Sequence, residues 1–160
     1  MYSNIYLVRE TPILKEDCFI DFKVCNMPLA SISSHIEVSD NPKLHIEQLG
    51  KWLSQNHLGE LRENCILLSQ DHFPESEYFE SRYLRFKEIA GQLASISYER
   101  FINDFDWIFE MLFQVSQQMS DAYEDYVCWD SGIPVTMSEF LRKAQPGTPY
   151  YIGGVYQYHY

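Results

Sequence analysis

One stretch constrains the fold more than any other: residues 98–126 read YERFINDFDWIFEMLFQVSQQMSDAYEDY. Apolar side chains recur there at alternating spacings of four and three, which places them on one side of an α-helix. Neighbouring apolar residues widen this stripe to roughly 200° of the helix circumference. We therefore expect one long helix whose apolar side lies at the centre of the fold. The recurring residues are Phe101, Phe105, Ile108, Leu112, Val115, Met119, Ala122 and Tyr126.

Three other segments also predict helices. Asn41-Pro42 supplies an N-cap and a first-turn proline for a helix that ends near Asn56. A second helix runs from about Glu75 to Ser95, where Ser97 can cap the 98–126 helix. Thr136-x-x-Glu139 is a capping box for a short helix through Ala144. Residues 75–126 can form one continuous helix or two, and we favour a hairpin because antiparallel helices hide their apolar stripes.

The N-terminal third predicts strands at residues 3–9, 18–25 and 31–38, with short connections that favour an antiparallel meander. The first strand is apolar on both faces, which is typical of an interior position in a sheet. Residues 60–69 fit a helix or a short buried strand, and we favour the helix. The C-terminal TPYYIGGVYQYHY predicts a strand or hairpin, with Gly153-Gly154 available as a tight turn.

These elements predict one α+β domain spanning residues 1–160. We expect a small antiparallel sheet, formed by the N-terminal strands and open to joining by the C-terminal strand, packed on a long helical hairpin.

The charge of the chain is strongly negative, at −11, and residues 99–130 hold eight acidic residues with Arg100 as their one basic residue. A field of this sign repels nucleic acid and anionic membranes and attracts basic proteins. The four cysteines show no C-x-x-C pair, and the sequence shows no secretory leader and no apolar run long enough to span a membrane. We expect free thiols and a cytoplasmic protein.

Common catalytic and phosphate-binding motifs are absent from the sequence, including G-x-x-x-x-G-K-[ST], G-x-S-x-G and H-E-x-x-H. His35 and Glu37 lie two apart on the third strand and can share a proton or a metal, although we expect ordinary solvated side chains. Cys25 or Cys128 can act as a nucleophile beside a histidine, but buried inert thiols are commoner. We predict no enzyme activity, no cofactor and no metal site.

The outer face of the 98–126 helix gives the functional hypothesis. Trp107 projects among acidic and amide side chains, and tryptophan is enriched among interface hot spots. We expect a small acidic inhibitor or immunity-type factor that covers a basic surface of a nuclease, toxin or other nucleic-acid-handling protein. The alternatives are an enzyme with a His/carboxylate site on the sheet, or a structural homodimer that buries its aromatic surplus. The predicted partner-binding residues are Asp106, Trp107, Glu110, Gln114, Asp121 and Glu124.

Overall fold

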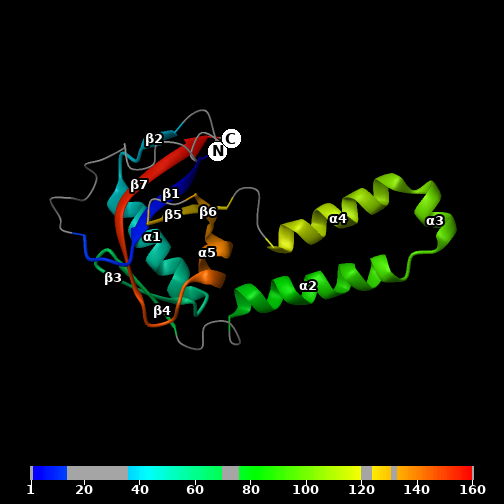
Figure 1. Ribbon diagram of the computed structural model, residues 1–160, viewed down its shortest axis with the longest axis horizontal. Coiled ribbons are helices and arrows are strands. Elements are labelled where there is room, and N and C mark those ends of the chain that lie inside the picture. Colours follow the sequence, from blue (N-terminus) through cyan, green and yellow to red (C-terminus); the bar gives the residue numbers. More distant parts are fainter. Residues whose placement is uncertain (1, 14–35, 70–75, 120–123, 131–132, 160) are drawn as a thin grey trace.

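The computed structural model describes residues 2–13, 36–69, 76–119, 124–130 and 133–159 of the chain. It divides into a body built on a mixed seven-stranded sheet and an arm of helices that projects from it (Figure 1). The predicted α+β class is confirmed. The strands are β1 (Tyr2–Arg9), β2 (Ile36–Val38), β3 (Gly59–Arg62), β4 (Cys65–Leu68), β5 (Tyr126–Trp129), β6 (Val135–Thr136) and β7 (Pro149–His159). The helices are α1 (Pro42–Gln55), α2 (Glu77–Ala94), α3 (Tyr98–Asn103), α4 (Phe105–Met119) and α5 (Met137–Lys143).

The sheet has the order β3-β4-β7-β1-β5-β6, and β2 also pairs with β7. The interior position predicted for the first strand is confirmed, because β1 runs antiparallel to β7 and parallel to β5. The sheet is therefore mixed rather than antiparallel. The predicted meander is wrong for the described strands, since β7 lies between β1 and β2. The predicted strand at residues 18–25 lies outside the described residues.

The C-terminal strand β7 forms the middle of the sheet and contains no tight turn at Gly153-Gly154. Both glycines continue the strand because side chains occupy the space that a Cβ atom would need. A Cβ on Gly153 would lie 2.7 Å from Ile13 Cδ1, and one on Gly154 would lie 3.3 Å from Leu7 Cδ1. The glycines therefore allow close packing in an extended strand.

Residues 59–68 form the hairpin of β3 and β4, so the helix favoured for this segment is wrong. Glu63 adopts a positive φ of 56° in the connecting turn. Ile66 and Leu68 are buried while their neighbours are half-buried, the alternation expected of a strand. Pairing of β4 with β7 provides the tertiary contact that local helix spacing did not reveal.

The core of the body forms where α1 and α5 pack on one face of the sheet. The predicted caps of both helices are confirmed: Asn41 Oδ1 accepts from Leu44 N, and Thr136 Oγ1 accepts from Glu139 N. Buried core residues include Leu49 and Leu53 of α1, Phe140 and Leu141 of α5, and Tyr6, Val8, Ile66, Tyr150, Ile152 and Val155 of the sheet.

The arm consists of α2 and α4 side by side, joined at the far end by α3 (Figure 1). The favoured helical hairpin is confirmed, but the single helix over 98–126 is wrong. Asp104 leaves the helical conformation, its carboxylate accepting from Trp107 N at 3.3 Å and from Arg100 Nε at 3.1 Å, and so separates α3 from α4. The stretch then contributes Tyr126 to β5.

The expectation that this stretch lies at the centre of the fold is also wrong. No residue of α4 is buried, and α2 buries Ile89 alone. The sheet is covered by α1 and α5, while the arm extends away from it. Among the described helices, none combines the length and apolar character needed to cross a bilayer.

Candidate functional site

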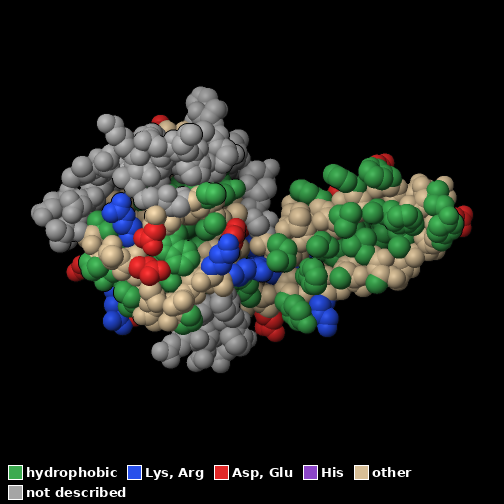
Figure 2. Space-filling model, viewed as in Figure 1, with side chains coloured by type: hydrophobic (Ala, Val, Ile, Leu, Met, Phe, Trp, Pro, Cys, Tyr) green, Lys and Arg blue, Asp and Glu red, His purple; other side chains and the backbone are tan. Residues whose placement is uncertain are grey.

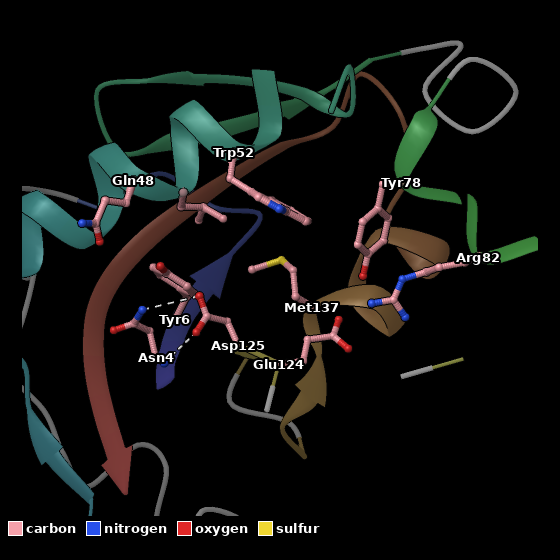
Figure 3. A pocket seen from close by; sticks show the side chains of 10 residues that line it. Asn4, Tyr6, Gln48, Trp52, Tyr78, Arg82, Glu124, Asp125 and Met137 are labelled. Atoms are coloured by element: carbon pink, nitrogen blue, oxygen red, sulfur yellow. Dashed lines mark hydrogen bonds between the residues drawn. The ribbon is translucent and has the colours of Figure 1, made fainter. Parts of the chain in front are cut away.

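Among the described residues we consider two regions as candidate binding surfaces, and the first is a cavity of about 380 Å³ where the body meets the start of the arm (Figure 3). α1 contributes Trp52, β1 contributes Tyr6, and α2 contributes Tyr78 and Arg82. The cavity is therefore walled by aromatic rings with charged groups between them. The complete lining is Asn4, Tyr6, Gln48, Leu49, Trp52, Tyr78, Arg82, Glu124, Asp125 and Met137.

Asp125 is half-buried and provides one of the two carboxylates of this cavity. It accepts hydrogen bonds from the backbone N–H of Asn4 at 2.7 Å and from Asn4 Nδ2 at 3.4 Å. Burial raises the pKa of Asp125 even though these bonds oppose the shift. Burial likewise raises the pKa of Tyr6, whose hydroxyl donates to the backbone oxygen of His45 at 3.3 Å. Burial therefore favours the protonated forms of Asp125 and Tyr6 on this wall of the cavity.

The opposite wall ties the cavity to the arm. The Glu124 carboxylate accepts a hydrogen bond from Ser138 N, and the Ser138 hydroxyl is hydrogen-bonded to the Tyr78 hydroxyl. Burial raises the pKa of Tyr78. The Arg82 guanidinium lies 4.4 Å from the centre of the Tyr78 ring and donates to the backbone oxygen of Gln117 at 3.1 Å. Arg82 therefore links α2 both to the cavity and to α4.

The chemistry available to the cavity is hydrogen bonding and ring contact with a small polar molecule. Its described lining contains no histidine or cysteine. Within the described part of the chain, no cluster of three or more metal-ligating side chains occurs. Of the enzyme candidates from sequence, Glu37 is exposed in β2 and Cys128 is buried in β5, while His35 and Cys25 lie outside the described residues.

The second region is the arm, where the structure brings together four of the six predicted partner-binding residues on α4. Asp106 and Glu110 are exposed. Trp107 is half-buried with the Arg100 guanidinium 3.8 Å from the centre of its ring. Gln114 accepts from Arg85 Nη2 of α2 at 3.0 Å. Trp107 and Gln114 therefore take part in contacts inside the arm, and the two carboxylates face solvent.

The remaining two predicted residues do not join that face. Glu124 lies beyond α4, on the wall of the cavity at the start of the arm. Asp121 lies outside the described residues. The structure therefore separates Glu124 from the four α4 residues.

Sequence reasoning missed the most exposed apolar surface among the described residues. α4 carries two apolar seams, and its inner seam of Ile108, Met111 and Val115 is half-buried on the side that meets α2. The outer seam points to solvent, and its exposed fractions run from 51% for Met119 to 81% for Tyr98. Figure 2 shows hydrophobic side chains gathered along the arm. The outer seam consists of Phe105, Phe109, Leu112 and Met119 of α4 and continues onto α3 with Tyr98 and Ile102.

In the sequence, the residues of the outer and inner seams lie side by side and together form one broad apolar stripe. The width of this stripe indicates a second contact surface, because a helix that packs against one neighbour needs a narrower apolar side. Comparison with protein-family models, with curated protein sequences and with solved structures finds no match for this chain.

Proposed function

We propose that this chain is a non-enzymatic binding protein whose α2–α4 arm docks onto a partner protein. The observation that carries the proposal is the outer seam. If a large side chain exposes roughly 200 Å² when fully in water, its six members leave roughly 700–800 Å² uncovered. Exposed apolar patches on monomeric proteins rarely exceed a few hundred Å², and larger ones mark interaction sites.

The charge beside the seam specifies the chemistry of the partner. Asp106 and Glu110 are exposed on the side of α4 next to Phe109 and Phe113. An apolar centre with a carboxylate edge fits a surface that is apolar in the middle and basic at its border. The charge of −11 would speed the encounter with such a partner. An inhibitor or immunity-type factor that covers a basic nuclease or toxin acts in this way.

Affinity capture from cells that natively make the protein tests the proposal. We expect the wild-type chain to retain a basic partner, with less retained as the salt concentration rises. Phe109→Ala and Asp106→Lys should each reduce retention, because they remove the apolar centre and reverse the steering charge. Glu47→Lys makes the same charge change on an exposed site of α1 and should retain the partner.

Retention unaffected by Phe109→Ala and Asp106→Lys would reject the arm as the binding surface. Equal loss with Glu47→Lys would show that net charge alone, rather than the arm, governs binding.

A further inference from the structure

The arm has the geometry of half a helical bundle. α4 uses its inner seam against α2, and its outer seam follows at spacings of four, three and seven residues, about a quarter of a turn away. Tyr83 and Phe86 of α2 lie with Met119 around one groove, so the outer apolar face extends across both helices. A helix with two seams normally packs against helices on two sides.

The two ends of the arm are complementary to one another. At the base, Phe79, Tyr83, Phe86 and Met119 line an apolar groove of about 300 Å³. At the tip, α3 exposes a knob made by Tyr98, Phe101 and Ile102. A groove at one end and a knob at the other cannot meet within one arm, but they can meet between two.

Charge follows the same division. Arg82 and Arg142 line the base groove, and the Arg142 guanidinium lies 5.2 Å from the centre of the Phe79 ring. The tip carries an exposed Glu99 in the first turn of α3, next to the knob, while the neighbouring Arg100 is paired with Asp104 at 3.1 Å. Figure 2 shows both basic and acidic side chains where the arm leaves the body, and acidic ones at its far end. The arginine side chains at the groove and the Glu99 carboxylate beside the knob attract each other.

From these features we propose that the occupant of the outer face is the arm of a second copy of this chain, packed antiparallel. The proposal rests on the arm being the docking element, as argued above, but assigns its outer apolar face to a second copy, so that dimerisation and capture of a basic partner through this face compete. A two-fold axis across the arm places each tip in the base groove of the other copy, so that both knobs are buried and both grooves are filled. The two arms then form a four-helix bundle, and the two acidic bodies lie at opposite ends.

The surface available is sufficient for such a dimer. The outer seam, which includes Tyr98 and Ile102 of the knob, offers roughly 700–800 Å² on each copy, and stable interfaces bury about 800 Å² per partner. α2 has 18 residues and is therefore about 27 Å long, so the antiparallel arms overlap over their full length. A hydrophobic surface of this size without charged members along the seam is typical of homodimer interfaces.

Sedimentation velocity between about 1 and 100 µM tests the proposal on the full chain. Wild type should sediment as a dimer at the upper concentrations. Phe109→Glu places a charge in the middle of the seam and should raise the dimer dissociation constant at least about a hundredfold. Ile133→Glu makes the same kind of change at an exposed apolar site of the body and should leave the dimer intact.

A charge-reversal pair tests the antiparallel arrangement without touching the apolar seam. Glu99→Arg and Arg142→Glu should each weaken the dimer roughly tenfold, because each creates two like-charge contacts. Mixing the two variant proteins should restore dimers, since each tip then meets a groove of opposite charge. Circular dichroism of each variant should match wild type, because both positions are exposed.

Monomeric wild type at 100 µM would overturn the second copy as occupant. A dimer that survives Phe109→Glu, or mixed charge variants that stay monomeric, would overturn it as well. If wild type is monomeric while partner capture still depends on Phe109 and Asp106, the arm remains the docking element for a different protein. If both measurements ignore the arm, the proposed function fails too.

Discussion

The body and the arm contain the same kinds of side chain in opposite environments. In the body, Phe140, Trp129 and Tyr150 meet edge to face, with ring centres 5.2–5.7 Å apart, and Phe140 is fully buried. In the arm, Phe105 and Phe109 stack with ring centres 6.1 Å apart and remain mostly exposed. The body's aromatic residues stabilise the fold, whereas those of the outer seam are available to stabilise a complex.

The difference follows from the number of neighbours that each helix has. α5 contacts the sheet through Phe140 and Leu141 and is anchored at its start by Glu124. α4 packs chiefly on α2, around the buried Ile89. A segment with few buried apolar contacts opens at a lower free energy than the core does. The arm should therefore contribute less than the body to the global free energy of unfolding.

The largest expected contrast compares two phenylalanines. Phe140→Ala removes a fully buried ring and should lower the free energy of unfolding by about 3–5 kcal/mol. Phe109→Ala removes an exposed ring and should change it by less than about 0.5 kcal/mol. Urea denaturation at low micromolar concentration checks both values. A comparable loss from both variants would contradict the contrast and indicate that the outer seam is covered in solution.

Repeating that pair at high protein concentration sharpens the comparison. If a second copy covers the seam, the cost of Phe109→Ala should grow with concentration, because association stabilises the folded wild type by mass action. The loss of unfolding free energy that Phe140→Ala causes through lost core packing should not change with protein concentration. A Phe109→Ala effect that is independent of concentration would count against self-association.

Two glycines provide the next contrast. A Cβ on Gly59 would lie 2.4 Å from the backbone oxygen of Leu67, so Gly59→Ala forces β3 and β4 apart and should destabilise the protein by about 1–3 kcal/mol. Gly91 lies in α2, and a Cβ added there would have no neighbouring atom within 4 Å outside its own helix backbone. Gly91→Ala should therefore stabilise α2 by up to about 1 kcal/mol through helix propensity. Thermal unfolding followed by circular dichroism measures both.

A third prediction concerns Asp125, at the boundary between body and arm. Because burial raises its pKa above that of the unfolded chain, the folded state holds the proton more tightly. The stabilisation from this proton is complete below the unfolded pKa of about 4 and is lost as the pH rises through the folded pKa. Asp125→Asn keeps an acceptor for Asn4 N and removes the titration.

The free energies of unfolding of the variant and wild type should therefore differ by less than about 1 kcal/mol at low pH. As the pH approaches neutrality, Asp125→Asn should become the more stable of the two. Urea denaturation midpoints between pH 3.5 and 7.5 provide the check. A difference that moves in favour of wild type over this range would mean that the ionised carboxylate is the stabilised form.

The sequence predicted local features better than it predicted contacts. The caps at Asn41, Ser97 and Thr136 depend on neighbouring residues alone, and all three are confirmed. The central place of β7 and the parallel pairing of β1 with β5 depend on segments more than a hundred residues apart, for which a single sequence has no signal. Asp104 was a missed local signal, because aspartate readily caps a new helix.

The candidate sites show the same limit. Periodicity identifies an amphipathic helix but does not identify what covers its apolar side, so Phe105 was assigned to a core that it does not enter. The cavity around Asp125 escaped notice because Asn4, Trp52 and Arg82 come from three separate elements. Asp106 and Glu110 could be placed on the solvent side of α4, since helix geometry alone determines that relation.

The smallest expected effect compares two of the confirmed N-caps, one in the body and one at the tip of the arm. Thr136 caps α5, which buries Phe140 and Leu141, so Thr136→Ala should lower the global free energy of unfolding by about 1 kcal/mol. Ser97 caps α3, which buries no residue at the tip of the arm. Ser97→Ala should lower the global value by a few tenths of a kcal/mol while speeding amide hydrogen exchange within α3. A global loss of about 1 kcal/mol from both variants would instead mean that the tip unfolds together with the body. The arm would then not open locally at a lower free energy than the core.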